Sequence, residues 1–385
     1  MSARATVARC VFALVILAGD MGVAQAAALE ASQQIETYSQ VAYLNYQDAY
    51  EAARKLQTAV DDFVHQSSDD LDESLVHVRQ AWLDARPSYG QSEAFRFYEG
   101  PIDFIARPDG TQGPEGLINA WPLNESYIDA VVDDENAPIT RAALVERNAK
   151  DDEADVTTGF HAIEYLLWGP DLSATGPGNR SARDFVGEGK GERRRAYLKV
   201  ATDLLVDDIH LLVEEWAPNR KDNYRARFQA MPYTESIAKI LTGVATLSGF
   251  ELGYERLATA LDSGSQEDEQ SCFSDNTPVD VLANATGVAN VYFGRYGRYQ
   301  GTGLNSLVAA VDPQMNDILK EQIAKSLALA RQMDRPFDRT LATSPGSPQR
   351  AKVEALVTSL QTQARLFTAA GSRLGVNIVV AVENE

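Results

Sequence analysis

Helical periodicity is the sequence feature that most limits the fold of this chain. Residues 30–66 place apolar side chains three and four positions apart, as at Ile35, Tyr38, Val41 and Ala42, which predicts a long amphipathic helix. Similar spacing predicts further helices over residues 70–85, 115–132, 138–150, 155–168, 192–216, 232–262, 278–293, 304–334 and 348–380. No alternation of period two is long enough to indicate a sheet. The predicted fold class is therefore all-α.

The length of the chain and one polar break predict two tandem helical bundles. With 385 residues, the chain is too long for one ordinary hydrophobic core. Residues 169–192 are rich in Gly, Pro and Ser, so we interpret them as an excursion between two bundles. We predict a signal peptide at 1–26, an N-terminal bundle at 27–188 and a C-terminal bundle at 189–385.

A weak internal repeat supports two related bundles. Ala120-Trp121-Pro122, followed by Glu125-Ser126, resembles Ala230-Met231-Pro232, followed by Glu235-Ser236, and each Pro would open a helix. Gly159-Phe160-His161 resembles Gly249-Phe250-Glu251 in the same way. We interpret this as a divergent internal duplication in which only the first copy keeps the polar residues described below.

The first 26 residues have the organisation of a secretory signal peptide. Arg4 and Arg9 precede the apolar run VFALVILA, and Ala24-Gln25-Ala26 provides a small-x-small cleavage site. The apolar run is too short for a membrane anchor, which needs roughly 18 to 20 residues. Cys10 lies at the start of the run, not at the cleavage site, which argues against a lipoprotein anchor. We expect a soluble exported chain, periplasmic or associated with the outer membrane, without a transmembrane span after cleavage.

Charge and cysteine content narrow the function further. The net charge of −20 disfavours nucleic acids and anionic membranes as partners and attracts cations only in a general way. Cleavage of the signal peptide would leave Cys272 as the one cysteine, so no intrachain disulfide is expected. We interpret Cys272 as a structural buried thiol; a reactive thiol and a soft metal ligand are the alternatives.

Residues 155–169, DVTTGFHAIEYLLWG, contain two polar residues on an otherwise apolar helix. His161 and Glu164 are surrounded by apolar side chains on every side of the helical wheel, so this helix should be buried. A buried imidazole and a buried carboxylate each need a partner. Residues at i and i+3 share a helix face, so both side chains can converge on one metal ion.

The histidine content favours an oxygen-rich metal site. The H-E-x-x-H motif is absent, and the inverted H-x-x-E-H motif fails because Tyr165 replaces the second His. The three other histidines, at 65, 77 and 210, are expected on helix surfaces, so further ligands would be carboxylates. One imidazole among carboxylates suits iron, manganese or calcium better than a His-rich zinc site would. The sequence contains no G-x-S-x-G motif and no Gly-rich phosphate loop after a strand.

Two segments are predicted to add residues to this site. Residues 86–103 combine charged and aromatic side chains between Pro and Gly residues, which is typical of a loop folded over a site. The alternative is a helix-bridging segment whose Arg and Glu pair with each other. The loop that carries Asp268, Glu269, Asp275, Asn276 and Asp280 is similar in kind, but it does not match the EF-hand spacing.

The motif G-x-H-x-x-E at Gly159 to Glu164 resembles the imelysin-like family of exported bacterial proteins. The resemblance covers nearly the whole chain after residue 26 and includes EAFRF at 93–97, GPID at 100–103, NAWPLNESYID at 119–129, DEQSCFSDNT at 268–277 and NVYFGRYG at 290–297. The last two segments are most similar to the iron-regulated branch, whereas other members are named as insulin-cleaving metallopeptidases. The resemblance implies a pair of helical bundles with the site between them, around His161 and Glu164.

Three functions remain open from the sequence. The first is a periplasmic metal-binding protein that serves iron uptake together with envelope proteins. Its divalent or trivalent metal is expected to be iron, with zinc and calcium as alternatives. The second is a metal-dependent endopeptidase, in which Glu164 would be catalytic but could not easily be both ligand and base. The third is a helical scaffold that binds a small anionic ligand. The expected metal ligands are His161, Glu164, Glu93 and Asp275, and the expected pocket residues are Arg86, Tyr89, Ser92, Asp103 and Asn276.

Overall fold

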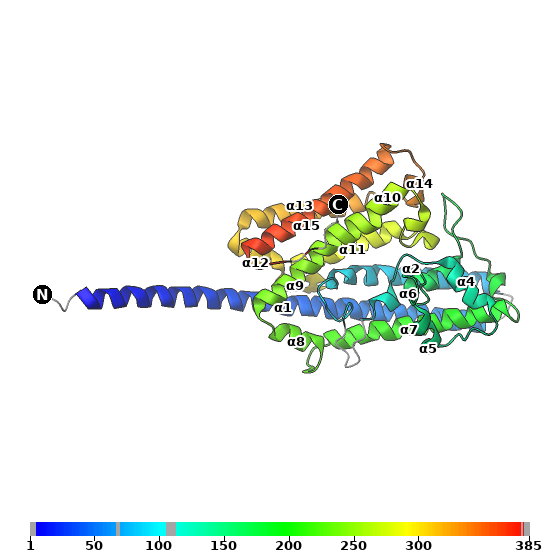
Figure 1. Ribbon diagram of the computed structural model, residues 1–385, viewed down its shortest axis with the longest axis horizontal. Coiled ribbons are helices and arrows are strands. Elements are labelled where there is room, and N and C mark those ends of the chain that lie inside the picture. The colour runs from blue at the N-terminus through cyan, green and yellow to red at the C-terminus, as the bar shows by residue number, and fades with distance from the viewer. Residues whose placement is uncertain (1–4, 67–69, 105–112, 379, 381–385) are drawn as a thin grey trace.

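The computed structural model describes residues 5–66, 70–104, 113–378 and 380, with side chains described from residue 32 onward (Figure 1). Helices dominate, and the prediction of an all-α fold is confirmed. Within the described residues, the strands are confined to a short hairpin of β1 (Arg295–Tyr296) and β2 (Tyr299–Gln300). No described helix is both long and apolar enough to cross a membrane.

The helix α1 (Ala5–His65) is the longest element of the fold. It includes most of the segment predicted as a signal peptide, whose residues 1–4 lie outside the described residues, and all but the last residue of the helix predicted at 30–66. Figure 1 shows the N-terminal part of α1 extending away from the body of the molecule. From residue 34 onward, the predicted apolar face is buried, including Ile35, Tyr38, Val41 and Ala42.

A first group of helices forms around α1. The helices α2 (Leu71–Ser92) and α7 (Lys190–Trp216) pack along α1, and α6 (Gly159–Trp168) packs against α2 and α7. Polar contacts follow the same pairing, since Lys199 binds Asp61 at 2.6 Å and Gln57 binds Asp203 at 2.7 Å. The helix α7 packs on α1 although it lies beyond residue 188; the division into bundles at 27–188 and 189–385 stays a prediction. The three short helices of this group are α3 (Glu115–Ile118), α4 (Glu125–Asp133) and α5 (Arg141–Arg147).

A second group of helices follows α8 (Tyr224–Ala230), which the sequence did not predict. The helix predicted at 232–262 consists of α9 (Tyr233–Thr246), the π-helix η4 (Leu247–Ala258) and α10 (Thr259–Ser263). The helix predicted at 304–334 is divided into α12 (Leu304–Val311) and α13 (Pro313–Ala330), because the side chain of Asp312 caps α13 by accepting a hydrogen bond from Met315 N at 3.0 Å. The group is completed by α11 (Thr277–Phe293), α14 (Asp338–Leu341) and α15 (Pro348–Arg373).

The two groups meet where α2 crosses α11. A Cβ atom on Gly287 would lie 2.2 Å from the carbonyl oxygen of Gln91, so only glycine allows this approach of the two backbones. Asn284 donates a hydrogen bond to the carbonyl of Gly90 at 2.8 Å, and Arg86 pairs with Asp280 at 3.1 Å. This crossing brings the end of α2 and the start of α11 beside α6.

The segments of the internal repeat differ in local structure. Pro232 directly precedes α9, whereas Pro122 lies three residues before α4. Gly159 begins α6, whereas Gly249 lies inside η4. The duplication therefore stays a prediction.

Candidate functional site

The helix α6 begins at a position that only glycine can occupy. Gly159 has a φ of 82°, and a Cβ atom there would lie 2.4 Å from the carbonyl oxygen of Ile118. All ten residues of α6 are buried, as the apolar surroundings of His161 and Glu164 predict. The close contact with α3 thus fixes where the helix starts and where both polar side chains lie.

His161 and Glu164 bind each other at the centre of this helix. The distance from His161 Nδ1 to Glu164 Oε2 is 2.9 Å, and neither side chain is exposed. Glu164 Oε1 accepts two further hydrogen bonds from Ser274, from its backbone N at 2.9 Å and from its Oγ at 2.7 Å. Both oxygens of Glu164 are therefore engaged in hydrogen bonds.

The second nitrogen of His161 has no such partner. Nε2 is buried and makes no hydrogen bond with any residue that the structure describes. The Trp121 ring meets the imidazole edge to face at a centroid distance of 4.9 Å. A buried nitrogen without a donor or acceptor costs free energy, so Nε2 is the atom of this centre that is open to a ligand.

Burial controls the protonation of the pair. It lowers the pKa of His161 well below its usual value, and the positive charges of Arg86 and Arg256 lower it further. Burial raises the pKa of Glu164 to about 8, although the hydrogen bonds from Ser274 act in the opposite direction. At neutral pH, the favoured state is a neutral imidazole beside a protonated carboxyl group, whose proton lies between Oε2 and Nδ1.

Arg86 organises the side of the centre that faces α11. It pairs with Asp280 through Nε and donates to Asn119 Oδ1 from Nη1 at 2.6 Å. Asn276, a predicted pocket residue, also donates to Asp280, at 3.2 Å. Two further polar atoms around Arg86, Asn119 Nδ2 and the hydroxyl of Tyr89, lack hydrogen-bond partners among the described residues. Of the predicted pocket residues, the structure therefore brings Arg86, Tyr89 and Asn276 to this centre.

The remaining predicted pocket residues lie in other contacts. Residues 86–92 form the last turns of α2, so the prediction of a loop there is wrong; Pro87 is accommodated inside the helix. Ser92 donates to the carbonyl of Tyr89 within the same helix. Asp103 accepts a hydrogen bond from Phe97 N at 2.8 Å and lies 3.7 Å from Arg96. Both side chains are therefore engaged in contacts with groups other than His161 and Glu164.

Glu93 belongs to a separate buried network of charges. It lies in the short helix η2 (Glu93–Phe95) and pairs with Arg96 at 2.9 Å and with Arg256 of η4 at 2.7 Å. Although burial alone would raise its pKa, the two arginines hold it at about 2. This arrangement matches the alternative considered for residues 86–103, in which Arg and Glu pair with each other. Glu93 is not assembled with His161 into a set of metal ligands.

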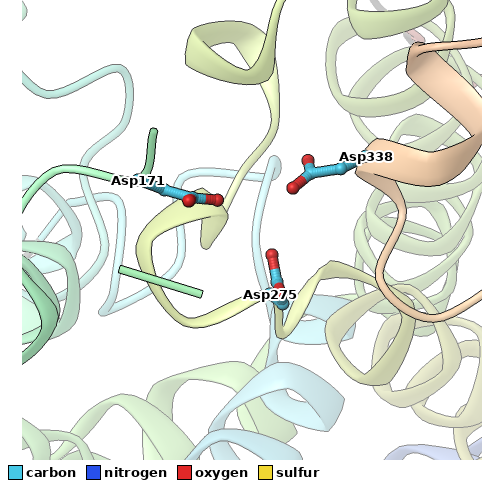
Figure 2. Close-up of side chains that lie close together, drawn as sticks. All are labelled: Asp171, Asp275 and Asp338. Atoms are coloured by element: carbon cyan, nitrogen blue, oxygen red, sulfur yellow. The ribbon is translucent and has the colours of Figure 1, made fainter. Parts of the chain in front are cut away.

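Asp275 follows Ser274, and its side chain lies among other acids. Its carboxylate lies with those of Asp171 and Asp338 (Figure 2), all within 4.8 Å of one another. The polar segment 169–192, interpreted as a free excursion, thus packs in part against the loop before α11, where Gly178 N donates to the carbonyl of Phe273 at 2.9 Å.

Sequence reasoning missed several residues of the site. Ser274 and Asn119 lie within the segments that resemble the known family, but neither carries an unusual signal of its own. Trp121 lies both in the repeat and in the segment 119–129 that resembles the family, but nothing in the sequence places it against His161. Asp338 lies far from every motif, and Asp171 follows Glu164 in a polar segment; only the tertiary fold brings these two acids together.

The fold and the centre on α6 define a helical protein with a buried imidazole and carboxylate pair in a G-x-H-x-x-E motif. The chain matches the model of the imelysin family, which carries a peptidase name, over residues 42–367. The chain belongs to the imelysin family.

Two solved structures are similar to this fold. One, from Parabacteroides distasonis, is described as an iron-regulated protein A precursor; it has 18% sequence identity and a TM-score of 0.72, and the match covers 90% of this chain and 95% of that one. The other is an imelysin-like protein from Psychrobacter arcticum with 14% identity and a TM-score of 0.65, covering 92% of this chain and 98% of that one. No curated protein sequence matches the chain.

Proposed function

We propose that the protein is exported and binds a metal ion, with iron favoured, as part of iron uptake. The observation that carries this proposal is His161 Nε2, a buried nitrogen without a partner on a ring whose other nitrogen is bound by a carboxylate. Histidines that bind metals commonly donate their second N–H to a carboxylate, which fixes the tautomer and the ring orientation. His161 Nδ1 and Glu164 Oε2, 2.9 Å apart, have this geometry, and His161 becomes the donor once Glu164 is ionised.

In this proposal, Glu164 positions His161. Its two oxygens are already engaged in hydrogen bonds with His161 and Ser274, which favours a positioning role over direct metal coordination. His161 would supply one nitrogen, and a bound metal would offer Lewis acidity and positive charge at that point. Further ligands would be water or anionic groups that arrive with the metal.

Export and the link to iron rest on separate support. The arrangement of Arg4, the apolar run and Ala24-Gln25-Ala26 is that of a signal peptide, and the N-terminal part of α1 extends away from the body of the fold. The similar structure from Parabacteroides distasonis is described as an iron-regulated protein precursor. Together they favour a role in the bacterial envelope, with iron-uptake proteins as partners.

The endopeptidase alternative needs a general base near the metal. Glu164 is the acidic side chain bound to His161, and its oxygens are occupied by three hydrogen bonds. A base must be able to accept a proton from water. Metal binding without proteolysis is therefore the better-supported function.

Titration of the purified chain with Fe²⁺ under anaerobic conditions, in parallel with the variant His161→Ala, tests the proposal. We expect His161→Ala to lose one equivalent of bound metal. A matched control, His210→Ala, removes a half-exposed histidine from α7 and should bind as the unmodified chain does. Equal binding by His161→Ala would contradict the proposal. Cleavage of insulin B chain that is abolished by a chelator and by Glu164→Ala would instead support the peptidase.

A further inference from the structure

Four acidic side chains from three separate segments meet beside the centre on α6. Asp171 lies in the segment after α6, Glu269 and Asp275 lie in the loop between α10 and α11, and Asp338 begins α14. We call these four residues the carboxylate cluster. Figure 2 shows the side chains of Asp171, Asp275 and Asp338 pointing toward one another, with their ligand oxygens within 4.8 Å.

Glu269 is a buried acid whose two carboxylate oxygens lack hydrogen-bond partners among the described residues. Its side chain is fully buried. Burial and the neighbouring Asp338 and Asp275 raise its pKa well above the usual value, whereas Thr277 acts in the opposite direction. The hydroxyl of Thr277 also donates a hydrogen bond to the carbonyl of Gln270.

Asp338 repeats this pattern. It is 1% exposed, and its Oδ1 also lacks a hydrogen-bond partner among the described residues. Its Oδ2 accepts a hydrogen bond of 2.6 Å from Gln266, whose amide nitrogen also lies 3.2 Å from Asp171 Oδ2 and 2.9 Å from the carbonyl oxygen of Ser173. One neutral amide thus serves two acids, and buried acids without donors are costly.

Asp171 and Asp275, the other two members, also lie close to like charges. Burial and Asp338 raise the pKa of Asp275 to about 7, against the attraction of Arg339. Burial, together with Asp338, raises the pKa of Asp171 to about 6. Protons can neutralise these groups at low pH, but at neutral pH a cation is the natural counterpart.

We propose that the carboxylate cluster is a binding site for a hard divalent cation, with Ca²⁺ favoured. All of its ligand atoms are oxygens, which hard cations prefer. Ca²⁺ takes roughly six to eight oxygens in a flexible geometry, which suits carboxylates that come from three separate segments, whereas Mg²⁺ demands a near-ideal octahedron. The carbonyl oxygen of Ser173, which accepts a hydrogen bond from the same Gln266 amide nitrogen, would add a neutral ligand.

Such a cation would connect the two groups of helices. Asp171 belongs to the first group, and Glu269, Asp275 and Asp338 belong to the second. Asp275 also directly follows Ser274, which donates two hydrogen bonds to Glu164. The bound cation would therefore hold Ser274 in place, although the site does not depend on metal binding by His161.

Calorimetric titration of the EDTA-treated full chain with CaCl₂ at pH 7.5 tests this proposal. We expect one bound equivalent of Ca²⁺ and an increase in Tm, with weaker binding of Mg²⁺. Asp338→Asn and Glu269→Gln should each lower the Ca²⁺ affinity at least tenfold. Glu267→Gln removes an equal charge from the same loop at an exposed position and should change the affinity less than twofold.

Two outcomes would overturn the proposal. One is the absence of both Ca²⁺ binding and a Tm increase in the unmodified chain, and the other is unchanged affinity in a folded Asp338→Asn or Glu269→Gln variant, as checked by circular dichroism. The two metal proposals fail independently, because His161→Ala should retain the Ca²⁺ site and Asp338→Asn should retain the Fe²⁺ site.

Discussion

The centre on α6 and the carboxylate cluster lie close together in the fold, but they differ in how many of their buried polar atoms have hydrogen-bond partners. In the first, one helix and one loop engage both oxygens of Glu164 in hydrogen bonds and leave a single nitrogen open. In the second, three segments bring four acids together and leave several oxygens without donors. Under the two proposals, a preorganised nitrogen and an unbalanced set of oxygens would therefore suit different metals.

The largest expected effect concerns the glycine that starts α6. Gly159→Ala should lower the free energy of unfolding by about 3 kcal/mol, because alanine is strained at this positive φ and its Cβ would overlap the carbonyl of Ile118. Denaturation in urea measures this effect. Gly116→Ala in the neighbouring α3, where a Cβ would meet nothing within 4 Å, is the matched control and should leave stability unchanged or slightly higher. If both variants behaved alike, the contact with α3 would not set the position of His161.

A second prediction concerns protons at the centre on α6. Coordination at His161 Nε2 requires a neutral ring with its proton on Nδ1, bound to an ionised Glu164. Because the pKa of Glu164 is raised to about 8, metal binding below that pH should release one proton, and affinity should increase about tenfold per pH unit between pH 6 and 7.5. Titrations in buffers of different ionisation enthalpy would measure the released proton. Affinity independent of pH over this range would contradict the assignment.

A third prediction concerns the carboxylate cluster in the absence of metal: its contribution to the stability of the protein should decrease as the pH rises. The pKa values of Asp171 and Asp275 are raised, to about 6 and about 7, so the stability they contribute is fully present below about pH 4 and is lost as pH rises through these values. Urea denaturation in EDTA should therefore show a less stable protein at pH 8 than at pH 5. Asp338→Asn should regain at least about 1 kcal/mol at pH 8, since it removes a like charge from the cluster. A larger loss of stability in the variant would show that Asp338 is needed for packing.

The smallest effect is expected at Ser274, which binds Glu164 and directly precedes Asp275 of the carboxylate cluster. Ser274→Ala removes the hydroxyl that binds Glu164 but keeps the backbone N–H, so it should cost about 1 kcal/mol of stability. The loss of this donor should also raise the pKa of Glu164 further and weaken metal binding at neutral pH. Ser372→Ala, which removes a hydroxyl bonded within α15, serves as a control for the effect of the substitution itself. Equal metal affinity in both variants would show that Ser274 does not support Glu164.

The sequence predicted the helical class and the buried pair because both leave local traces. Helical spacing reveals an apolar face, and two polar residues among apolar neighbours reveal a buried polar site. The ends of α9 and α13 were harder to predict, because the π-helical turns of η4 and the cap at Asp312 depend on packing and on single hydrogen bonds. The last turns of α2 contain Pro87, whose usual role as a helix breaker led to the incorrect loop.

Contacts between distant segments explain the other differences. Glu93 was a reasonable metal ligand until the fold placed Arg256, which is 163 positions away in sequence, against it. Asp171 and Asp338 gave no local signal because each is one acid in a polar segment. Glu164 illustrates the same limit, since spacing predicts that it can reach a metal but not that Ser274 occupies its second oxygen.

The buried pair of Arg86 and Asp280 has a consequence for the alignment of the whole molecule. A buried ion pair adds little net stability, but a shift of α11 along α2 by one turn would separate the two charges and leave both without compensation, at a cost of several kcal/mol. The pair therefore favours a single alignment of α11 along α2. The loop that carries Ser274 and Asp275 ends only a few residues before Asp280. The alignment of α11 along α2 therefore also determines where this loop contacts α6.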